Sequence, residues 1–159
     1  MKKPYQIESQ RAMKQLAKMT AVGNPAVQRA PPLAEMIDWL CNAFGFEKQV
    51  VFATPDGKVM HSQLIFGNGM MMVGSVDNGS PSSKLMRQPD EIGGAETQAP
   101  YLVVDDIDAM YASAKAAGAE IVFDLEEKDY GGKAFSCRDP EGHIWHVGTF
   151  DPWEPPPAQ

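Results

Sequence analysis

The feature that most constrains the fold of this chain is an internal repeat, in which one helix and several strands recur in the same order. In the first copy, apolar residues recur at helical spacing over residues 33–44, and Gly45 follows them where a helix would end. Apolar runs at 50–52, 59–66 and 70–75 predict three strands, the last two joined by an Asn-Gly turn.

The second copy contains the same elements and begins with a clear strand. The pattern predicts a strand over residues 101–104, a helix over 107–117, and further strands at 121–123, 134–138 and 144–148. Neither copy alone could bury the faces of its sheet. We therefore expect the α+β class, with two tandem βαβββ modules that form a curled mixed sheet around a cavity. Matching points support the repeat: Gly118 with Gly45, 121–123 with 50–52, Lys133 with Lys58, and 147–149 with 73–75.

The first copy lacks an obvious strand in front of its helix. Pro31 and Pro32 occupy the equivalent place, and consecutive prolines are poorly suited to a central strand. Three alternatives remain: the strand is shortened, it is shifted to about residues 26–30, or the N-terminal segment of this chain or of a partner replaces it. A short amphipathic helix is predicted over residues 6–21.

These patterns divide the chain into five segments. The long linker is rich in Asn, Gly, Ser and Pro, and we expect it to connect the two modules and to cover part of a site. The segments are a basic N-terminal helical arm (1–24), the first module (25–75), the linker loop (76–98), the second module (99–150) and a Pro-rich tail (151–159).

Charge is distributed unevenly along the chain. The net charge is −7, yet residues 1–30 contain six Lys or Arg and a single acidic residue. We expect this basic arm to dock on the acidic body or on a neighbouring subunit. The acidic balance argues against a nucleic-acid partner. The absence of a long apolar run argues against a membrane partner, and without a secretory signal Cys41 and Cys137 are expected to be reduced in the cytoplasm.

Three stretches carry a resemblance to a known family: residues 36–46, residues 103–108 with 117–119, and the turn sequence 138–143. Over about residues 26–150 the chain resembles the vicinal oxygen chelate superfamily, which includes glyoxalase I, bleomycin-resistance proteins and extradiol dioxygenases. The resemblance implies tandem βαβββ modules around a cavity. Dimers are frequent in this superfamily, so we expect a homodimer.

The resemblance also implies where a metal would be held, with one His, Gln or Glu on each of four strands. His146 occupies one of these positions, whereas Met72 and Ala99 occupy two others. The fourth position lies in the region of the missing strand, where residues 20–31 contain no His, Glu or Asp. One ligand of four is too few for a catalytic divalent metal. We expect no metal and no other cofactor, and a divalent metal only under the alternative of a lyase, isomerase or dioxygenase.

The leading hypothesis is a protein of the bleomycin-resistance type that binds a small molecule in the cavity between the two modules. No catalytic residue is assigned because no nucleophile motif is present. His146 is either a hydrogen-bonded part of the cavity wall or a ligand contact, and His61 either lines the cavity or lies in solvent. Arg138 either bonds the following turn or anchors a ligand carboxylate. The candidate ligand-binding residues are His61, Gln63, Met72, Tyr101, Arg138 and His146.

Overall fold

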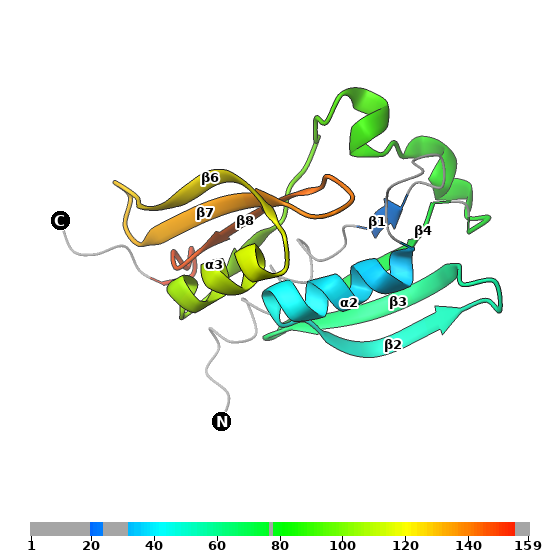
Figure 1. The fold of residues 1–159 in the computed structure, drawn as a ribbon, viewed down its shortest axis with the longest axis horizontal. Coiled ribbons are helices and arrows are strands. Elements are labelled where there is room, and N and C mark those ends of the chain that lie inside the picture. The colour runs from blue at the N-terminus through cyan, green and yellow to red at the C-terminus, as the bar shows by residue number, and fades with distance from the viewer. Residues whose placement is uncertain (1–19, 24–31, 77, 155–159) are drawn as a thin grey trace.

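The structure is a computed structural model, and it describes residues 20–23, 32–76 and 78–154. The described chain contains two four-stranded sheets, each accompanied by one α-helix (Figure 1). This arrangement confirms the predicted α+β class and the two βαβββ modules.

The first module has the strand order β1-β4-β3-β2. Strand β1 runs parallel to β4, whereas β3 is antiparallel to both β4 and β2. Its elements are β1 (Thr20–Gly23), α2 (Leu33–Phe44), β2 (Glu47–Ala53), β3 (Val59–Phe66) and β4 (Gly69–Ser75).

The second module repeats this topology in the order β5-β8-β7-β6, again with one parallel pair, β5 and β8. Its elements are β5 (Tyr101–Val103), α3 (Ile107–Ala116), β6 (Glu120–Glu127), β7 (Lys133–Arg138) and β8 (Ile144–Gly148).

The repeat extends to individual hydrogen bonds. In the first module the Ser75 hydroxyl accepts from the backbone N–H of Val59 at 3.0 Å. In the second, the Thr149 hydroxyl accepts from the backbone N–H of Lys133, also at 3.0 Å. In both copies, a side-chain hydroxyl at the end of the fourth strand thus accepts a hydrogen bond from the first backbone N–H of the third strand.

Each helix ends at a glycine, as the sequence predicts. Gly45 and Gly118 have φ angles of 76° and 84°, a region that side chains with a Cβ rarely enter. Asp106 is the N-cap of helix α3, and its carboxylate accepts from the N–H of Ala109 at 3.0 Å.

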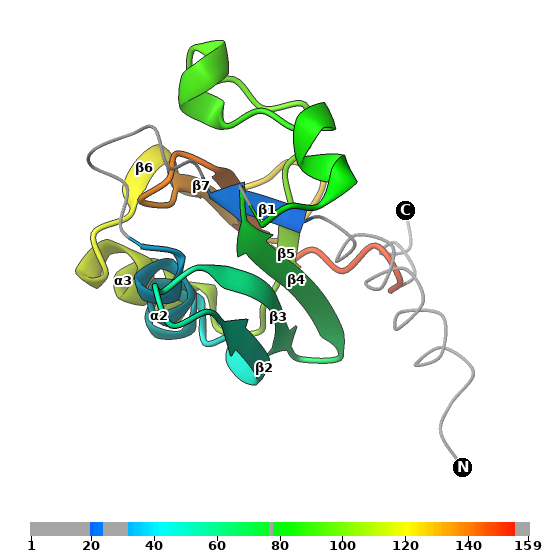
Figure 2. The ribbon, with the colours of Figure 1, turned by 90° about the vertical axis from the view of Figure 1, so that its right-hand side faces the viewer.

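Helices α2 and α3 lie side by side on one side of the two sheets (Figures 1 and 2). Two hydrogen bonds join them: Trp39 Nε1 donates to the Ala117 carbonyl at 2.7 Å, and the Ser113 hydroxyl donates to the Asn42 carbonyl at 2.9 Å. These contacts connect the two modules through their helices.

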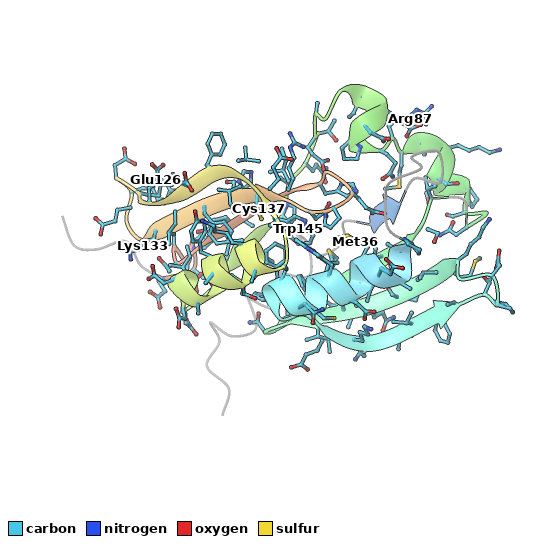
Figure 3. The ribbon with its side chains drawn as sticks, viewed as in Figure 1. Met36, Arg87, Glu126, Lys133, Cys137 and Trp145 are labelled. Atoms are coloured by element: carbon cyan, nitrogen blue, oxygen red, sulfur yellow. The ribbon has the colours of Figure 1, made fainter. Side chains whose placement is uncertain are left out.

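The core lies between these helices and the sheets. The Trp145 ring packs 5.1 Å from Phe44 and 5.9 Å from Phe46, centroid to centroid, so aromatic residues of the first module contact the last strand of the second. Figure 3 shows Met36 and Trp145 in this interior, whereas Arg87 and Glu126 lie at the periphery.

The predicted strand boundaries need three corrections. Strand β2 begins at Glu47 rather than Val50, and β6 continues to Glu127 rather than ending at Phe123. The apolar runs marked only the centres of these strands, because both are solvent-exposed along most of their length and carry polar ends. The third correction is the first strand, which lies at Thr20–Gly23.

This position of β1 corresponds to the alternative in which the N-terminal segment of this chain supplies the strand. Thr20 and Ala21 therefore belong to a strand rather than to the end of the predicted helix. The rest of that helix prediction and the alternative strand at 26–30 lie outside the described residues. Strand β1 also precedes residue 25, where the first module was expected to begin.

The linker contains two short 3-10 helices, Pro81–Leu85 and Pro89–Ile92 (green in Figure 1). Gln88 between them is buried, and the Glu91 carboxylate accepts from its backbone N–H at 2.7 Å. The linker thus has a defined path over the body of the protein. No helix among the described residues is both long enough and apolar enough to span a membrane.

Candidate functional site

Each sheet turns one face toward the helices; the opposite face, whose side chains alternate with those that face the helices, is called here the open face. In β3, Ser62 and Leu64 are buried, whereas His61 and Gln63, which alternate with them, are only half-buried. Residues directly opposite each other on neighbouring strands share a face. The open face of the first sheet therefore carries Phe52, His61, Gln63 and Met72.

The polar residues of this face contact one another. Nε2 of His61 lies 3.1 Å from the amide nitrogen of Gln63. The Phe52 ring is nearly parallel to the imidazole, at 24° and 6.5 Å between centroids, and its side chain is 62% exposed. An imidazole, an amide and an aromatic ring are thus available together on one surface.

A pocket of about 260 Å³ opens where the linker crosses this face. His61, Met72 and Gly74 form the sheet side of the pocket, and Ser80, Ser82 and Ser83 of the linker lie along the other side. The linker therefore lines part of this pocket. The residues that line this pocket all come from the first module and the linker.

The open face of the second sheet carries Tyr101, Phe123, Ser136 and His146, which form one row across the four strands. His146 is paired with Tyr101 on one side and with Ser136 on the other, and Ser136 is paired with Phe123. The Ser136 hydroxyl lies 2.7 Å from Nδ1 of His146. Phe123 is 61% exposed at the outer strand, much like Phe52 in the first sheet.

Tyr101 is held firmly in this row. Its hydroxyl donates to the Phe150 carbonyl at 3.2 Å, and its ring crosses Gly148 so closely that a Cβ at that position would collide with it. Burial raises the pKa of the Tyr101 hydroxyl, so this group remains a neutral donor at physiological pH.

Arg138 shares the open face of the second sheet but is engaged by the neighbouring turn. Its Nη1 donates to the Gly142 carbonyl at 2.7 Å. The structure therefore groups His61 with Gln63 and Met72, and Tyr101 with His146, while Arg138 lies at the end of its sheet. Sequence reasoning missed Ser136, Phe52 and Phe123, which share faces with the predicted residues through strand pairing.

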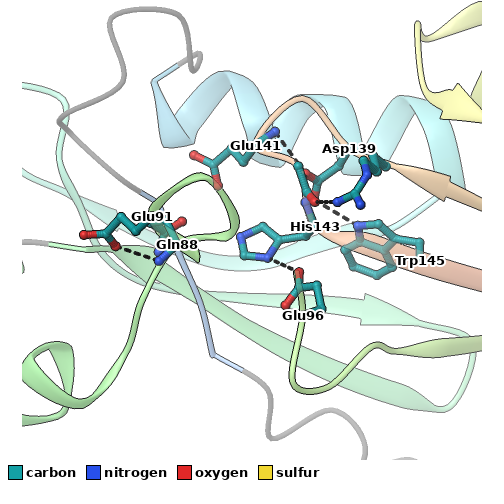
Figure 4. A network of polar contacts seen from close by, with 9 residues as sticks. Gln88, Glu91, Glu96, Asp139, Glu141, His143 and Trp145 are labelled. Carbon is teal, nitrogen blue, oxygen red and sulfur yellow. Dashed lines mark hydrogen bonds and ion pairs between the residues drawn. The ribbon is translucent and has the colours of Figure 1, made fainter. Parts of the chain in front are cut away.

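The turn after β7 is held by Asp139, which is buried (Figure 4). One carboxylate oxygen accepts from the backbone N–H groups of Glu141 and His143 at 2.9 and 3.0 Å, and the other accepts from Trp145 Nε1 at 2.9 Å. His143 Nδ1 lies 2.8 Å from the Glu96 carboxylate, which ties the linker to this turn. The turn motif thus acts as a structural anchor.

Of the four strand positions that the resemblance implies for a metal, three are identified by residue: Met72, Ala99 and His146. Met72 and Ala99 offer no oxygen or nitrogen side-chain donor, and only His146 does. Within the described residues, no group of three or more His, Cys, Asp and Glu side chains is arranged to hold a metal ion.

Comparison with known proteins agrees with this fold. The sequence model of the Glyoxalase/Bleomycin resistance protein/Dioxygenase superfamily matches residues 24–147. The uncharacterized protein Mb0911c of Mycobacterium bovis is 31% identical over 115 residues, which is 72% of this chain and 74% of that protein.

Two solved structures place the fold among known ones. TioX from Micromonospora sp. ML1 superimposes with a TM-score of 0.58 at 30% identity, over 75% of this chain and 89% of TioX. A mutant of the genomically encoded fosfomycin resistance protein FosX from Listeria monocytogenes, in complex with Mn(II) and a dihydroxypropylphosphonic acid, has the same TM-score at 11% identity. That match covers 86% of this chain and 90% of FosX, and it shows a shared fold only.

Proposed function

Because this chain belongs to the Glyoxalase/Bleomycin resistance protein/Dioxygenase superfamily, we propose that it binds a small molecule on the open faces of its two sheets. The proposed contacts are His61, Gln63 and Met72 in the first module, and Tyr101, Arg138 and His146 in the second. Binding is proposed to require no catalytic metal and no other cofactor.

The observation that carries this proposal is that each open face holds both an exposed phenylalanine and a half-buried imidazole. Phe52 lies opposite His61 in the first sheet, and Phe123 shares a row with His146 in the second. A mostly apolar surface with a few fixed polar groups is typical of small-molecule sites. The pocket beside His61 and Met72 has room for part of such a ligand.

The side-chain donors support the metal-free form of the proposal. Hard divalent cations require several oxygen or nitrogen ligands, and the strand positions equivalent to His146 hold Met72 and Ala99. Methionine instead adapts its shape to varied apolar ligands, which suits a binding surface.

The competing candidate is a divalent-metal-dependent lyase, isomerase or dioxygenase. One observation favours it: Nε2 of His146 has no hydrogen-bond partner among the described residues, so it is available to a metal. FosX, which shares the fold, was solved with Mn(II). Elemental analysis of protein that has been depleted of metal and reloaded with Ni, Zn, Mn or Fe distinguishes the metal-free binder from the metal-dependent enzyme. Stoichiometric metal that is lost in a His146→Ala variant would establish the competing candidate.

The binding proposal is tested by a thermal-shift screen of aromatic small molecules and cationic drugs with the full chain. We expect at least one aromatic compound to raise Tm, because a ligand that binds only the folded state stabilises it. The Phe52→Ala variant should lose this shift. Leu85→Ala is the matched control, since Leu85 is 88% exposed but lies outside the open faces. No stabilisation by any compound would contradict the proposal.

We also propose that the protein is a homodimer in the cytoplasm. Strands β2 and β6 are the outer strands of their sheets, and a second copy would cover these sheet edges. Cys41 and Cys137 are free thiols, which suits a reducing compartment. Light scattering of the full chain measures the mass, and a monomer at micromolar concentration would contradict the dimer.

A further inference from the structure

The two open faces share a second feature, which concerns the hydrogen atoms on their imidazoles. In the second sheet, Ser136 is 7% exposed and its hydroxyl lies 2.7 Å from Nδ1 of His146. A buried hydroxyl hydrogen requires an acceptor, and Nδ1 is the acceptor that the described residues offer it. Ser136 therefore donates, and a neutral His146 carries its hydrogen on Nε2.

The first sheet reaches the same result with different residues. The amide nitrogen of Gln63 lies 3.1 Å from Nε2 of His61. With the Gln63 amide in this orientation its nitrogen donates, and Nε2 of His61 is the acceptor. A neutral His61 then carries its hydrogen on Nδ1.

Both remaining N–H groups are open to a ligand. Neither His146 Nε2 nor His61 Nδ1 has a hydrogen-bond partner among the described residues. Both histidines are half-buried rather than buried, so part of each side chain is exposed. Each open face thus presents one N–H donor and an exposed phenylalanine: Phe52 stacks on His61, whereas Phe123 lies two strands from His146 in the same row.

We propose that His61 and His146 recognise the ligand as hydrogen-bond donors, and that the ligand is an aromatic molecule bearing neutral acceptor atoms such as ketone or quinone oxygens. Gln63 and Ser136 are positioning residues, because each occupies one ring nitrogen and so directs the N–H of the other toward the ligand. This inference rests on the proposed function. It disfavours ammonium ligands, since an ammonium group would face the N–H donors of the two imidazoles.

The positions of the hydrogens are measured by long-range ¹H–¹⁵N correlation spectra of the histidine rings at about pH 8, above the usual titration range of histidine. We expect Nε2–H for His146 and Nδ1–H for His61. His143 is the internal reference, because the Glu96 carboxylate beside its Nδ1 requires a hydrogen there. A hydrogen on Nδ1 of His146, or on Nε2 of His61, would overturn the inference.

Two variants test whether Ser136 sets the position of the hydrogen on His146 or only supports the fold. Ser136→Ala removes the donor, and we expect the Nδ1–H form of His146 to appear alongside Nε2–H. Ser136→Thr keeps the hydroxyl and should restore the single form. An unchanged His146 spectrum in Ser136→Ala would show that Ser136 does not position the ring, and would overturn its role. The wild-type measurement stands even where a variant folds poorly.

The ligand class is tested with three compounds of nearly equal size: 2-acetonaphthone, 2-ethylnaphthalene and 1-(2-naphthyl)ethylammonium. The ketone should bind about 2- to 10-fold more tightly than the hydrocarbon, the ratio that one added hydrogen bond supports. The ammonium compound should bind most weakly, although the body of the protein is acidic. Ammonium binding as tight as that of the ketone would overturn the acceptor preference alone, whereas binding by none of the three would contradict the proposed function itself.

Discussion

The indole nitrogen of Trp145 lies 2.9 Å from Oδ2 of Asp139 and donates a hydrogen bond to it. Trp145 belongs to the core of the protein, and Asp139 holds the turn between β7 and β8. The bond thus fixes the turn to the aromatic cluster that joins the two modules.

We predict that Asp139→Asn destabilises the protein by about 1–3 kcal/mol, because an amide nitrogen would face a donor where an oxygen now accepts. Urea denaturation measures the change. Asp108→Asn is the matched control: Asp108 makes only a surface ion pair with Lys133, at 3.3 Å, and its loss should cost less than about 1 kcal/mol. Equal effects of the two variants would contradict the anchoring role.

A second prediction concerns pH. Burial and the neighbouring Asp139 carboxylate raise the pKa of Glu141 from 4.5 to about 7. Between these values the unfolded chain releases a proton that the folded protein retains, so the free energy of unfolding falls as pH rises. Glutamine does not titrate, so this fall in the free energy of unfolding should be absent in the Glu141→Gln variant. The variant should gain up to about 3 kcal/mol relative to the wild type between pH 4.5 and pH 8. Parallel stability curves in chemical denaturation across this range would contradict the prediction.

The third prediction follows from the contact between Glu96 and His143, whose side chains are both less than 20% exposed. His143→Ala should loosen the linker without unfolding the modules, because it removes a tie between the linker and the turn. Limited trypsin digestion should then cleave faster after Arg87, which lies in the linker. Glu47→Gln, an exposed carboxylate in β2, is the control and should leave the rate unchanged. Equal rates for His143→Ala and the wild type would refute the tie.

The fourth prediction concerns the contact between the helices. Trp39→Phe keeps an aromatic ring near Phe44 but loses the hydrogen bond to the Ala117 carbonyl. We expect a loss of about 1 kcal/mol, or a fall in Tm of about 2–4 °C. Trp153→Phe is the matched control, since Trp153 is exposed near the C-terminus. Should both variants melt at the same temperature, this bond contributes nothing to the docking of the two modules.

Much of the fold was predictable because the helices and most strands follow simple patterns. Helix α2 has the predicted limits of 33 and 44, and β3 those of 59 and 66. The strand β1 at Thr20–Gly23 was one of three alternatives, since a strand of four residues is too short to show a clear hydrophobic period. Its parallel pairing with β4 depends on a contact distant in sequence.

The site was less predictable, because it depends on register. His61 and His146 stand out by residue type, whereas Ser136 is an ordinary strand serine until its pairing with His146 is known. Likewise, Phe52 and Phe123 fit a core equally well by composition, and both are more than 60% exposed. Which residues share an open face follows from strand pairing that the sequence alone does not determine.

The central claim, that a small molecule binds the open faces, is tested most directly with the full chain carrying ¹³C in its methionine methyl groups. Met72 lies on the open face of the first sheet, whereas Met36 is buried in the core and serves as the reference. On titration with 2-acetonaphthone we predict that the Met72 methyl resonance shifts in a saturable way while Met36 remains in place. An unmoved Met72 at the highest soluble concentration, or a shift confined to residues away from the open faces, would contradict the account.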